Sequence, residues 1–290
     1  MYKLIAIDLD GTLLDSYGNI DKETKDALEK AKKKGVEIVL ASGRPIKSTL
    51  SIARELGIDN YIISGNGSIL LDVQNDELLF EGFLDKEEVY NVARFCEENS
   101  IYYNVYTLDE IVCGQIKYNT IFYHTENTYK PADKKTDINL VDNTYRYIKS
   151  LKDPKFLKIT IADESEKIFN NIIKKLRENE DLTILDTSYM SRKIIRQGSF
   201  NVEINYFYTE ITKKNINKWR AIDALIKKLG IKKEEVITIG DNFNDIEMIE
   251  NAGLGVAMGN ASEDIKKLAD YVTSTNDDGG VLNVIKKYIY

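Results

Sequence analysis

The strongest constraint on this chain is its first stretch of fifteen residues, MYKLIAIDLDGTLLD. Residues 4–7 are continuously apolar and lead directly into Asp8, with Asp10 two residues later. A short apolar run that ends in polar residues is typical of a parallel strand buried on both faces. We therefore predict a buried strand over residues 4–9 whose carboxyl end carries two carboxylates.

Strand-like and helix-like segments alternate after this first strand. Asp21 is suited to cap a helix over residues 22–34, and Pro45 suits the start of a second helix. Strand-like runs cover residues 36–41 and 61–63. This alternation predicts an α/β fold, a Rossmann-like doubly wound parallel sheet with ligands at the carboxyl ends of the strands.

The middle of the chain has a different texture, rich in tyrosine and in short β-type runs. We expect strands near residues 101–106, 120–123, 156–161, 193–196 and 202–207, with a long helix over 164–178. The α/β pattern returns after Glu210. We therefore predict a core domain made of residues 1–83 and 208–290, and an inserted α+β cap domain over residues 84–207.

Composition excludes several classes of function. The net charge of −7 disfavours a nucleic-acid partner, which would require a basic surface. No run approaches the roughly 18 apolar residues of a membrane span. Cys96 and Cys113 match no metal-binding spacing and favour reduced thiols in a cytoplasmic protein. Because His124 is the only histidine, a multi-histidine metal site is impossible and any metal must be held by oxygen.

The carboxylates themselves indicate a metal. Asp8 and Asp10 repel each other at one strand end, and Asp241 and Asp245 follow a second strand over residues 236–239. Several carboxylates without histidine suit a hard cation in an oxygen shell, and Mg²⁺ fits best. Mg²⁺ commonly binds together with phosphate oxygens, so these residues predict a site for a phosphoryl group.

Two further groups on the chain would suit that phosphoryl group, namely the Ser42 hydroxyl and the Lys218 ammonium. One aspartate would attack phosphorus and form an aspartyl-phosphate, while the other would transfer protons. Taken alone, each motif also fits an ordinary turn, a helix cap or a solvated lysine. Their recurrence in order, each at a predicted strand or helix end, favours the chemical interpretation.

Read together, these stretches resemble the haloacid dehalogenase superfamily, and within it the Cof-like subfamily of sugar-phosphatase-type hydrolases with a type IIB cap. The matching motifs are Asp8-Leu9-Asp10-Gly11-Thr12, Ser42-Gly43-Arg44-Pro45, Lys218, Gly240-Asp241-Asn242-Phe243-Asn244-Asp245, Ala257-Met258-Gly259-Asn260-Ala261 and Asn276-Asp277-Asp278-Gly279-Gly280-Val281. The likeness covers the core from end to end, and its first and fourth motifs are the most specific.

The resemblance implies a role for each motif residue. Asp8 would be the nucleophile, Asp10 the general acid and base, and Ser42 and Lys218 would hold the phosphoryl oxygens. Mg²⁺ would be bound by the Asp8 and Asp241 side chains and the Asp10 carbonyl, and Asp245 would complete the metal site as a ligand through water or as an orienting group. The substrate-binding positions would be Gly11, Gly43, Arg44, Asn66 and Asn244. The cap would choose the leaving group.

The resemblance implies a Mg²⁺-dependent phosphatase of small phosphorylated metabolites. A phosphomutase with a similar core, or a catalytically silent metabolite-binding protein, are the alternatives. Two positions depart from the family pattern, because Trp219 follows the motif lysine where a small residue is usual, and Ser68 replaces a frequent alanine. The sequence leaves the substrate open, and the oligomeric state as a monomer or small homo-oligomer.

Overall fold

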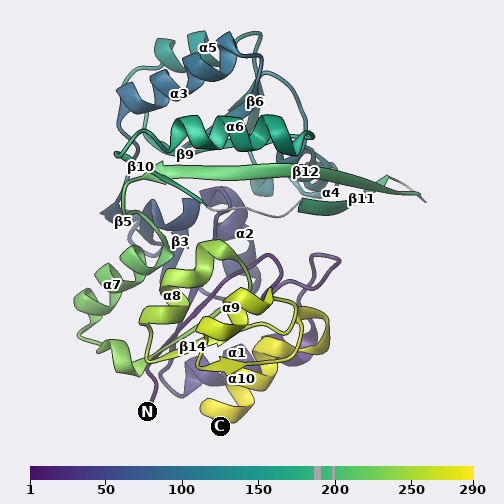
Figure 1. Ribbon diagram of the computed structural model, residues 1–290. Coiled ribbons are helices and arrows are strands. Elements are labelled where there is room, and N and C mark those ends of the chain that lie inside the picture. Colours follow the sequence, from purple (N-terminus) through teal and green to yellow (C-terminus); the bar gives the residue numbers. More distant parts are fainter. Residues whose placement is uncertain (186–190, 198–199) are drawn as a thin grey trace. The chain divides into compact units, whose positions relative to one another are not determined.

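The computed structural model describes residues 1–185, 191–197 and 200–290. The chain forms two compact units, each with its own sheet (Figure 1). The first unit comprises residues 1–44, 49–81 and 216–290, and the second comprises residues 45–48 and 82–215.

The first unit is built on a mostly parallel sheet with strand order β15-β14-β13-β1-β2-β3-β4-β5. Its strands are β1 (Leu4–Ile7), β2 (Glu37–Ala41), β3 (Tyr61–Ser64), β4 (Ile69–Asp72), β5 (Glu77–Glu81), β13 (Val236–Gly240), β14 (Leu254–Ala257) and β15 (Tyr271–Val272). The β3–β4 and β4–β5 pairs are antiparallel and the others are parallel. The predicted α/β class is confirmed, and β1 lies between β13 and β2, so the residues after β1 and β13 are neighbours.

The helices of this unit are α1 (Lys22–Lys33), α2 (Ile46–Glu55), α7 (Lys218–Leu229), α8 (Ile246–Asn251), α9 (Glu263–Leu268) and α10 (Gly280–Tyr288). The first residues of α2 group with the second unit. As predicted, Asp21 caps α1 by accepting a hydrogen bond from the backbone N–H of Thr24 at 2.8 Å. Leu4 and Ala6 of β1 are fully buried in an apolar cluster that includes Ile222 of α7. Packing against this helix therefore fixes one face of the central strand.

The second unit has a sheet of strand order β10-β12-β9-β6-β7-β8, with β11 paired to β12. Its elements are β6 (Tyr102–Thr107), β7 (Ile111–Cys113), β8 (Ile138–Leu140), β9 (Phe156–Asp163), β10 (Leu182–Ile184), β11 (Ser191–Gln197), β12 (Phe200–Lys213), α3 (Lys86–Glu98), α4 (Asn119–Tyr129), α5 (Thr144–Ser150) and α6 (Glu166–Leu176). Val89 and Val92 of α3 pack with Ile159 and Ile161 of β9 in one apolar core. An α+β composition is therefore present here.

The strand expected over residues 120–123 is wrong, since these residues lie in helix α4. Periodicity alone does not separate a short apolar run on a strand from one on a helix. The local hydrogen bonds decide the outcome: the Thr120 hydroxyl donates to the Lys117 carbonyl at 2.7 Å and accepts from the Lys117 N–H at 2.8 Å. These bonds close a turn at the start of the helix, which a strand cannot accommodate.

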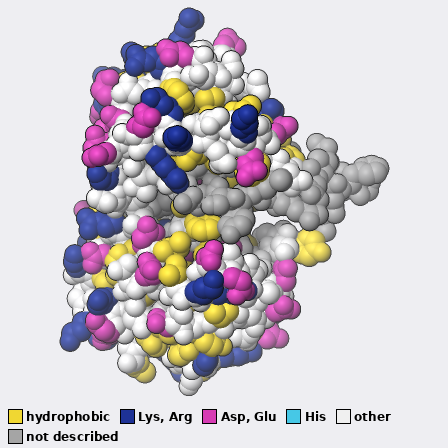
Figure 2. Space-filling view, in the orientation of Figure 1, with side chains coloured by type: hydrophobic (Ala, Val, Ile, Leu, Met, Phe, Trp, Pro, Cys, Tyr) yellow, Lys and Arg dark blue, Asp and Glu magenta, His cyan; other side chains and the backbone are white. Residues whose placement is uncertain are grey.

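Among the described residues, no helix has both the length and the apolar character needed to cross a membrane. On the face shown in Figure 2, acidic and basic side chains are interspersed over the described surface. On that face, the described surface lacks the broad basic stripe that is typical of nucleic-acid-binding proteins.

Candidate active site

The loop after β1 is folded tightly back on itself. The Leu13 N–H donates to the Asp8 carbonyl at 3.2 Å, and the Leu14 N–H donates to the Leu9 carbonyl at 2.9 Å. Gly11 has a φ of +83°, and a Cβ at this position would overlap the Asp241 carboxylate. The Asp-Gly turn thus lets the backbone approach a second carboxylate, which a residue with a side chain would prevent.

Asp241 and Asp245 lie at the neighbouring strand end, where β13 leads into the short 3₁₀ helix η4 (Phe243–Asp245). Asp245 is fully buried, and its Oδ2 accepts the backbone N–H groups of Asp241 and Asn242, both at 3.0 Å. The Asp241 Oδ1 accepts the Thr12 hydroxyl at 2.9 Å. Asp245 therefore orients the loop that carries Asp241, while Thr12 fixes the carboxylate itself.

Lys218 begins helix α7, where the Asn217 side chain caps the helix by accepting the Arg220 N–H at 3.0 Å. Its ammonium is completely buried and donates to Asp8 Oδ1 at 2.5 Å and to Asp245 Oδ1 at 2.6 Å. The bulky Trp219 packs instead against the apolar cluster under β1. The departure from the family pattern at Trp219 thus leaves Lys218 pointing at the carboxylates.

The start of α7 depends on a close backbone approach. Gly67, with a φ of +87°, lies so near the Asn217 carbonyl that a Cβ would overlap it. It closes the short 3₁₀ turn η1 (Gly65–Gly67), in which Asn66 has a φ of 58°. The Asn66 side-chain carbonyl accepts the Asn244 amide at 3.0 Å. The structure thus brings together Asn66 and Asn244, which lie 178 positions apart in the sequence.

The buried charges around Asp8 do not balance. Carboxylate oxygens of Asp8, Asp241 and Asp245 lie within 4.8 Å of one another, and in the described part of the chain the cation that contacts them is the Lys218 ammonium. Burial raises the pKa of Asp8 to about 7 against the lowering effect of Lys218, and burial together with Asp8 raises the pKa of Asp241 well above its usual range. Burial alone would lower the pKa of Lys218, but Asp245 and Asp8 together raise it.

This imbalance fits a divalent cation. A cation between Asp8 and Asp241 would supply the missing positive charge and would favour the ionised form of both groups. The donor set is all oxygen, as Mg²⁺ requires. Both oxygens of Asp245 already accept hydrogen bonds, which favours an orienting role for this residue.

Asp10 points to a different partner. Arg44, which follows β2 and is 3% exposed, grips the half-exposed Asp10 carboxylate through two hydrogen bonds of 2.7 and 2.8 Å. Arg44 was expected from the resemblance as a substrate contact, and nothing in the sequence indicated this fork. The Ser42 hydroxyl is buried beside it and accepts the Arg44 N–H at 3.1 Å, with Gly43 at the bend between them. The two motifs therefore meet at Asp10.

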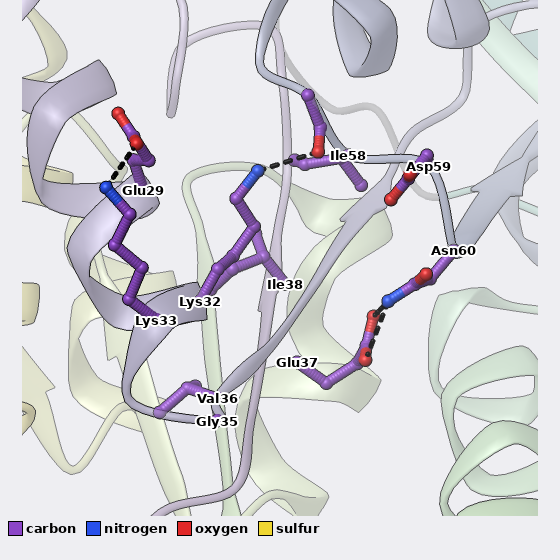
Figure 3. A pocket seen from close by; sticks show the side chains of 11 residues that line it. Glu29, Lys32, Lys33, Gly35, Val36, Glu37, Ile38, Ile58, Asp59 and Asn60 are labelled. Carbon is purple, nitrogen blue, oxygen red and sulfur yellow. Dashed lines mark hydrogen bonds and ion pairs between the residues drawn. The ribbon is translucent and has the colours of Figure 1, made fainter.

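A separate pocket of about 470 Å³ lies at the amino end of β2, around Glu37, Lys32 and Asn60 (Figure 3). Two of its charged groups already have partners: Lys32 donates to the Gly57 carbonyl at 2.6 Å, and Glu37 accepts the Asn60 amide at 3.2 Å. Ser42 follows the opposite, carboxyl end of the same strand, so this pocket is distinct from the carboxylate cluster.

The comparisons with known proteins agree with this arrangement. A family model for haloacid dehalogenase-like hydrolases matches residues 5–285. The chain belongs to this family. It is 32% identical to phosphatase YwpJ of Bacillus subtilis over 305 residues, covering 98% of this chain and 99% of the relative. It is 30% identical to the B. subtilis 5-amino-6-(5-phospho-D-ribitylamino)uracil phosphatase YcsE, covering 99% of this chain and 96% of that one.

Solved structures of the family have the same fold. A haloacid dehalogenase-like hydrolase from B. subtilis superposes with a TM-score of 0.81 at 30% identity, covering 99% of both chains. A sugar phosphatase of haloacid dehalogenase subclass IIB superposes with a TM-score of 0.74 at 26% identity, covering 99% of this chain and 98% of that one. The chain is therefore an enzyme, a phosphatase of this family that acts on phosphorylated substrates.

Proposed function

We propose that this enzyme is a Mg²⁺-dependent phosphatase of small phosphorylated metabolites and that it works through an aspartyl-phosphate on Asp8. The observation that carries the proposal is the buried contact of Asp8 with Lys218, next to the Asp241 carboxylate. The Asp8 and Asp241 side chains and the Asp10 carbonyl would hold Mg²⁺. When bound, the cation would neutralise the carboxylates and the phosphoryl oxygens, which otherwise repel each other.

In the first step an Asp8 oxygen attacks phosphorus, an O–P bond forms, and the bond from phosphorus to the leaving oxygen breaks. Asp10 donates a proton to that leaving oxygen. Lys218 and the Ser42 hydroxyl face the charge of the transferred group and need no reorganisation, because both are held in place by buried contacts.

In the second step Asp10 accepts a proton from water, which attacks phosphorus and releases phosphate and the free Asp8 carboxylate. Both Asp10 oxygens accept hydrogen bonds from Arg44 in this structure. To act as an acid, Asp10 must therefore take up a proton and give up at least one of these bonds.

We also propose that the second unit is a cap that selects the leaving group, and that Gly11, Gly43, Asn66 and Asn244 contact the substrate. Three B. subtilis relatives are named as phosphatases of 5-amino-6-(5-phospho-D-ribitylamino)uracil, and the subclass IIB structure is that of a sugar phosphatase. This supports a phosphorylated metabolite as substrate here. The buried free thiols Cys96 and Cys113 support the cytoplasm as its location.

The test uses 4-nitrophenyl phosphate with purified protein in Mg²⁺ and in chelator. Asp8→Asn removes the nucleophile at nearly constant shape, and Asp21→Asn is the matched control because Asn is an equally good helix cap. We expect wild type and Asp21→Asn to be active only with Mg²⁺, and Asp8→Asn to be inactive. Full activity of Asp8→Asn, or of wild type in chelator, would refute the mechanism. Isomerised product from a sugar phosphate would favour a phosphomutase.

A further inference from the structure

Two motif segments near the carboxyl end of the chain have no role in the chemistry described so far. Residues 257–261 begin at the last residue of β14, and residues 276–281 span the short 3₁₀ helix η5 (Asn276–Asp278) and the start of α10 (Figure 1). The two segments are bonded to each other. The Asn276 N–H donates to the Asn260 side-chain carbonyl at 3.0 Å, and the Gly259 N–H donates, also at 3.0 Å, to the carbonyl of Ser274, which lies just before the second segment.

Together these segments bind the backbone of the loop that carries Asp10. The Asn260 side-chain amide donates to the Gly11 carbonyl at 2.8 Å. The Asn276 side-chain amide donates to the Leu14 carbonyl at 2.9 Å. The Asn260 amide thus spans two chain segments, donating to one and accepting from the other, and we call Asn260 and Asn276 the asparagine clamp.

A third contact extends the clamp to the next residues of the loop. The Asp277 carboxylate accepts the Ser16 hydroxyl at 2.6 Å and the Ser16 N–H at 2.8 Å. Both hydrogen bonds lower the pKa of Asp277 below its usual value, and the bond from the Ser16 hydroxyl has the larger effect. Asp277 therefore stays ionised at neutral pH and keeps accepting both bonds.

The position of the clamped carbonyls connects them to the chemistry. Gly11 directly follows Asp10, and its carbonyl lies in the peptide plane that joins Gly11 to Thr12, so the Asn260 bond fixes the backbone one residue after Asp10. Arg44 holds the Asp10 side chain from the other direction. Asp10 is thereby located by its side chain and by the backbone next to it, and the clamp supplies the second constraint.

We propose that Asn260 and Asn276 are positioning residues of the active site, which act by fixing the backbone on which Asp10 is carried. The inference rests on the proposed role of Asp10 in proton transfer. A reacting group displaced by a fraction of an ångström loses rate without losing substrate affinity. A purely structural clamp would instead lower stability and leave the turnover of folded molecules unchanged.

The test replaces each clamp residue by its isostere. Asn260→Asp and Asn276→Asp keep the side-chain shape but turn the donor toward Gly11 or Leu14 into an acceptor. Asn283→Asp is the matched control, because the Asn283 amide donates to the Ser274 hydroxyl instead, at 3.0 Å. We expect both clamp variants to lose between about tenfold and a hundredfold in kcat with 4-nitrophenyl phosphate at unchanged KM. Their Tm should match that of the control, and Asn260→Ala and Asn276→Ala should repeat the loss.

A double-mutant cycle with Asp10→Asn separates positioning from general damage. If the clamp acts through Asp10, adding Asn260→Asp to Asp10→Asn causes no further loss of kcat. Multiplying losses, or clamp variants with the kcat of Asn283→Asp, would overturn the inference. If Asp10→Asn alone keeps wild-type kcat, the proposed function is wrong about Asp10, which is a different result from an inert clamp.

Discussion

Gly67→Ala tests whether the close approach of η1 to helix α7 positions Lys218. The substitution adds one methyl group at a residue whose backbone is left-handed and where the space is already filled. Gly67 has a φ of +87°. The new Cβ would overlap the Asn217 carbonyl and would lie 2.9 Å from the Lys218 backbone nitrogen. Since this is the residue whose ammonium contacts Asp8, a shift of the helix start changes the distance between Lys218 and Asp8.

Gly35→Ala is the matched control, because Gly35 has a φ of +83° but a Cβ there meets none of the described atoms within 4 Å. Both variants carry the cost of a left-handed backbone, roughly 1–2 kcal/mol. The overlap at Gly67 adds about 1–3 kcal/mol, as overpacking of a filled site does. We expect Gly67→Ala to lower the free energy of unfolding by about 2–5 kcal/mol in all, and Gly35→Ala by about 1–2 kcal/mol.

Urea unfolding followed by tryptophan fluorescence measures this difference, since Trp219 is the one tryptophan of the chain and lies in α7. The kcat with 4-nitrophenyl phosphate is measured on the folded variants. Gly67→Ala should lose at least about tenfold in kcat, and Gly35→Ala should keep wild-type kcat. Equal stability losses in the two variants, or wild-type kcat in Gly67→Ala, would show that the contact between η1 and α7 does not position Lys218.

Two further predictions concern Asp10 and the buried carboxylates. Arg44→Lys keeps a positive charge but loses the two-pronged grip on Asp10, so kcat should fall about tenfold while the Tm changes little; an unchanged kcat would exclude a role for the fork. In chelator, burial raises the pKa of Asp8 to about 7, so this group binds its proton more tightly in the folded than in the unfolded state. Its contribution to stability is therefore full below about pH 4 and is lost as the pH rises toward 7. The Tm should therefore fall between about pH 4 and pH 7 in chelator, and Mg²⁺ should raise it and flatten the slope; a Tm that is indifferent to Mg²⁺ across this range would exclude binding at Asp8.

The fold of the first unit could be predicted because its strands are buried on both faces and end in recognisable turns. Residues 4–7 are all fully buried, as their continuous apolar run indicated. The second unit was harder, since residue types that favour strands also occur in one of its helices, α4. The error over residues 120–123 arose there, where the hydroxyl of Thr120 closes a turn that periodicity does not reveal.

Those parts of the candidate site that depend on residue type could be predicted from the sequence. Those that depend on side-chain geometry could not. Carboxylates at two strand ends indicated a cation site, and the neighbouring register of β1 and β13 brings Asp8 close to Asp241. The pairing of Asp10 with Arg44 depends on side-chain directions in two loops, which spacing does not give. Thr12 belongs to the first motif, but nothing in the sequence indicated that its hydroxyl donates a hydrogen bond to Asp241.

The asparagine clamp shows the same limit. Asn260 and Asn276 were visible as parts of motifs, but their partners lie about 250 residues away at Gly11 and Leu14. A turn or helix-cap role is the ordinary expectation for an asparagine in a loop, and Asn260 also follows a glycine. Only the structure, in which these two segments lie against the loop after β1, reveals which carbonyls the two amides bind.

The most direct test of the central claim is to trap the phosphorylated enzyme. Asp10→Asn should slow the attack of water more than the first transfer, because the first step with an activated aryl leaving group needs little proton donation. The Asp10→Asn variant is mixed with Mg²⁺ and a substrate that carries radioactive phosphorus, and the reaction is quenched with acid. Peptide mapping should then place one phosphoryl group on Asp8. Steady turnover with no labelled protein at any quench time, or label on a residue other than Asp8, would contradict the account.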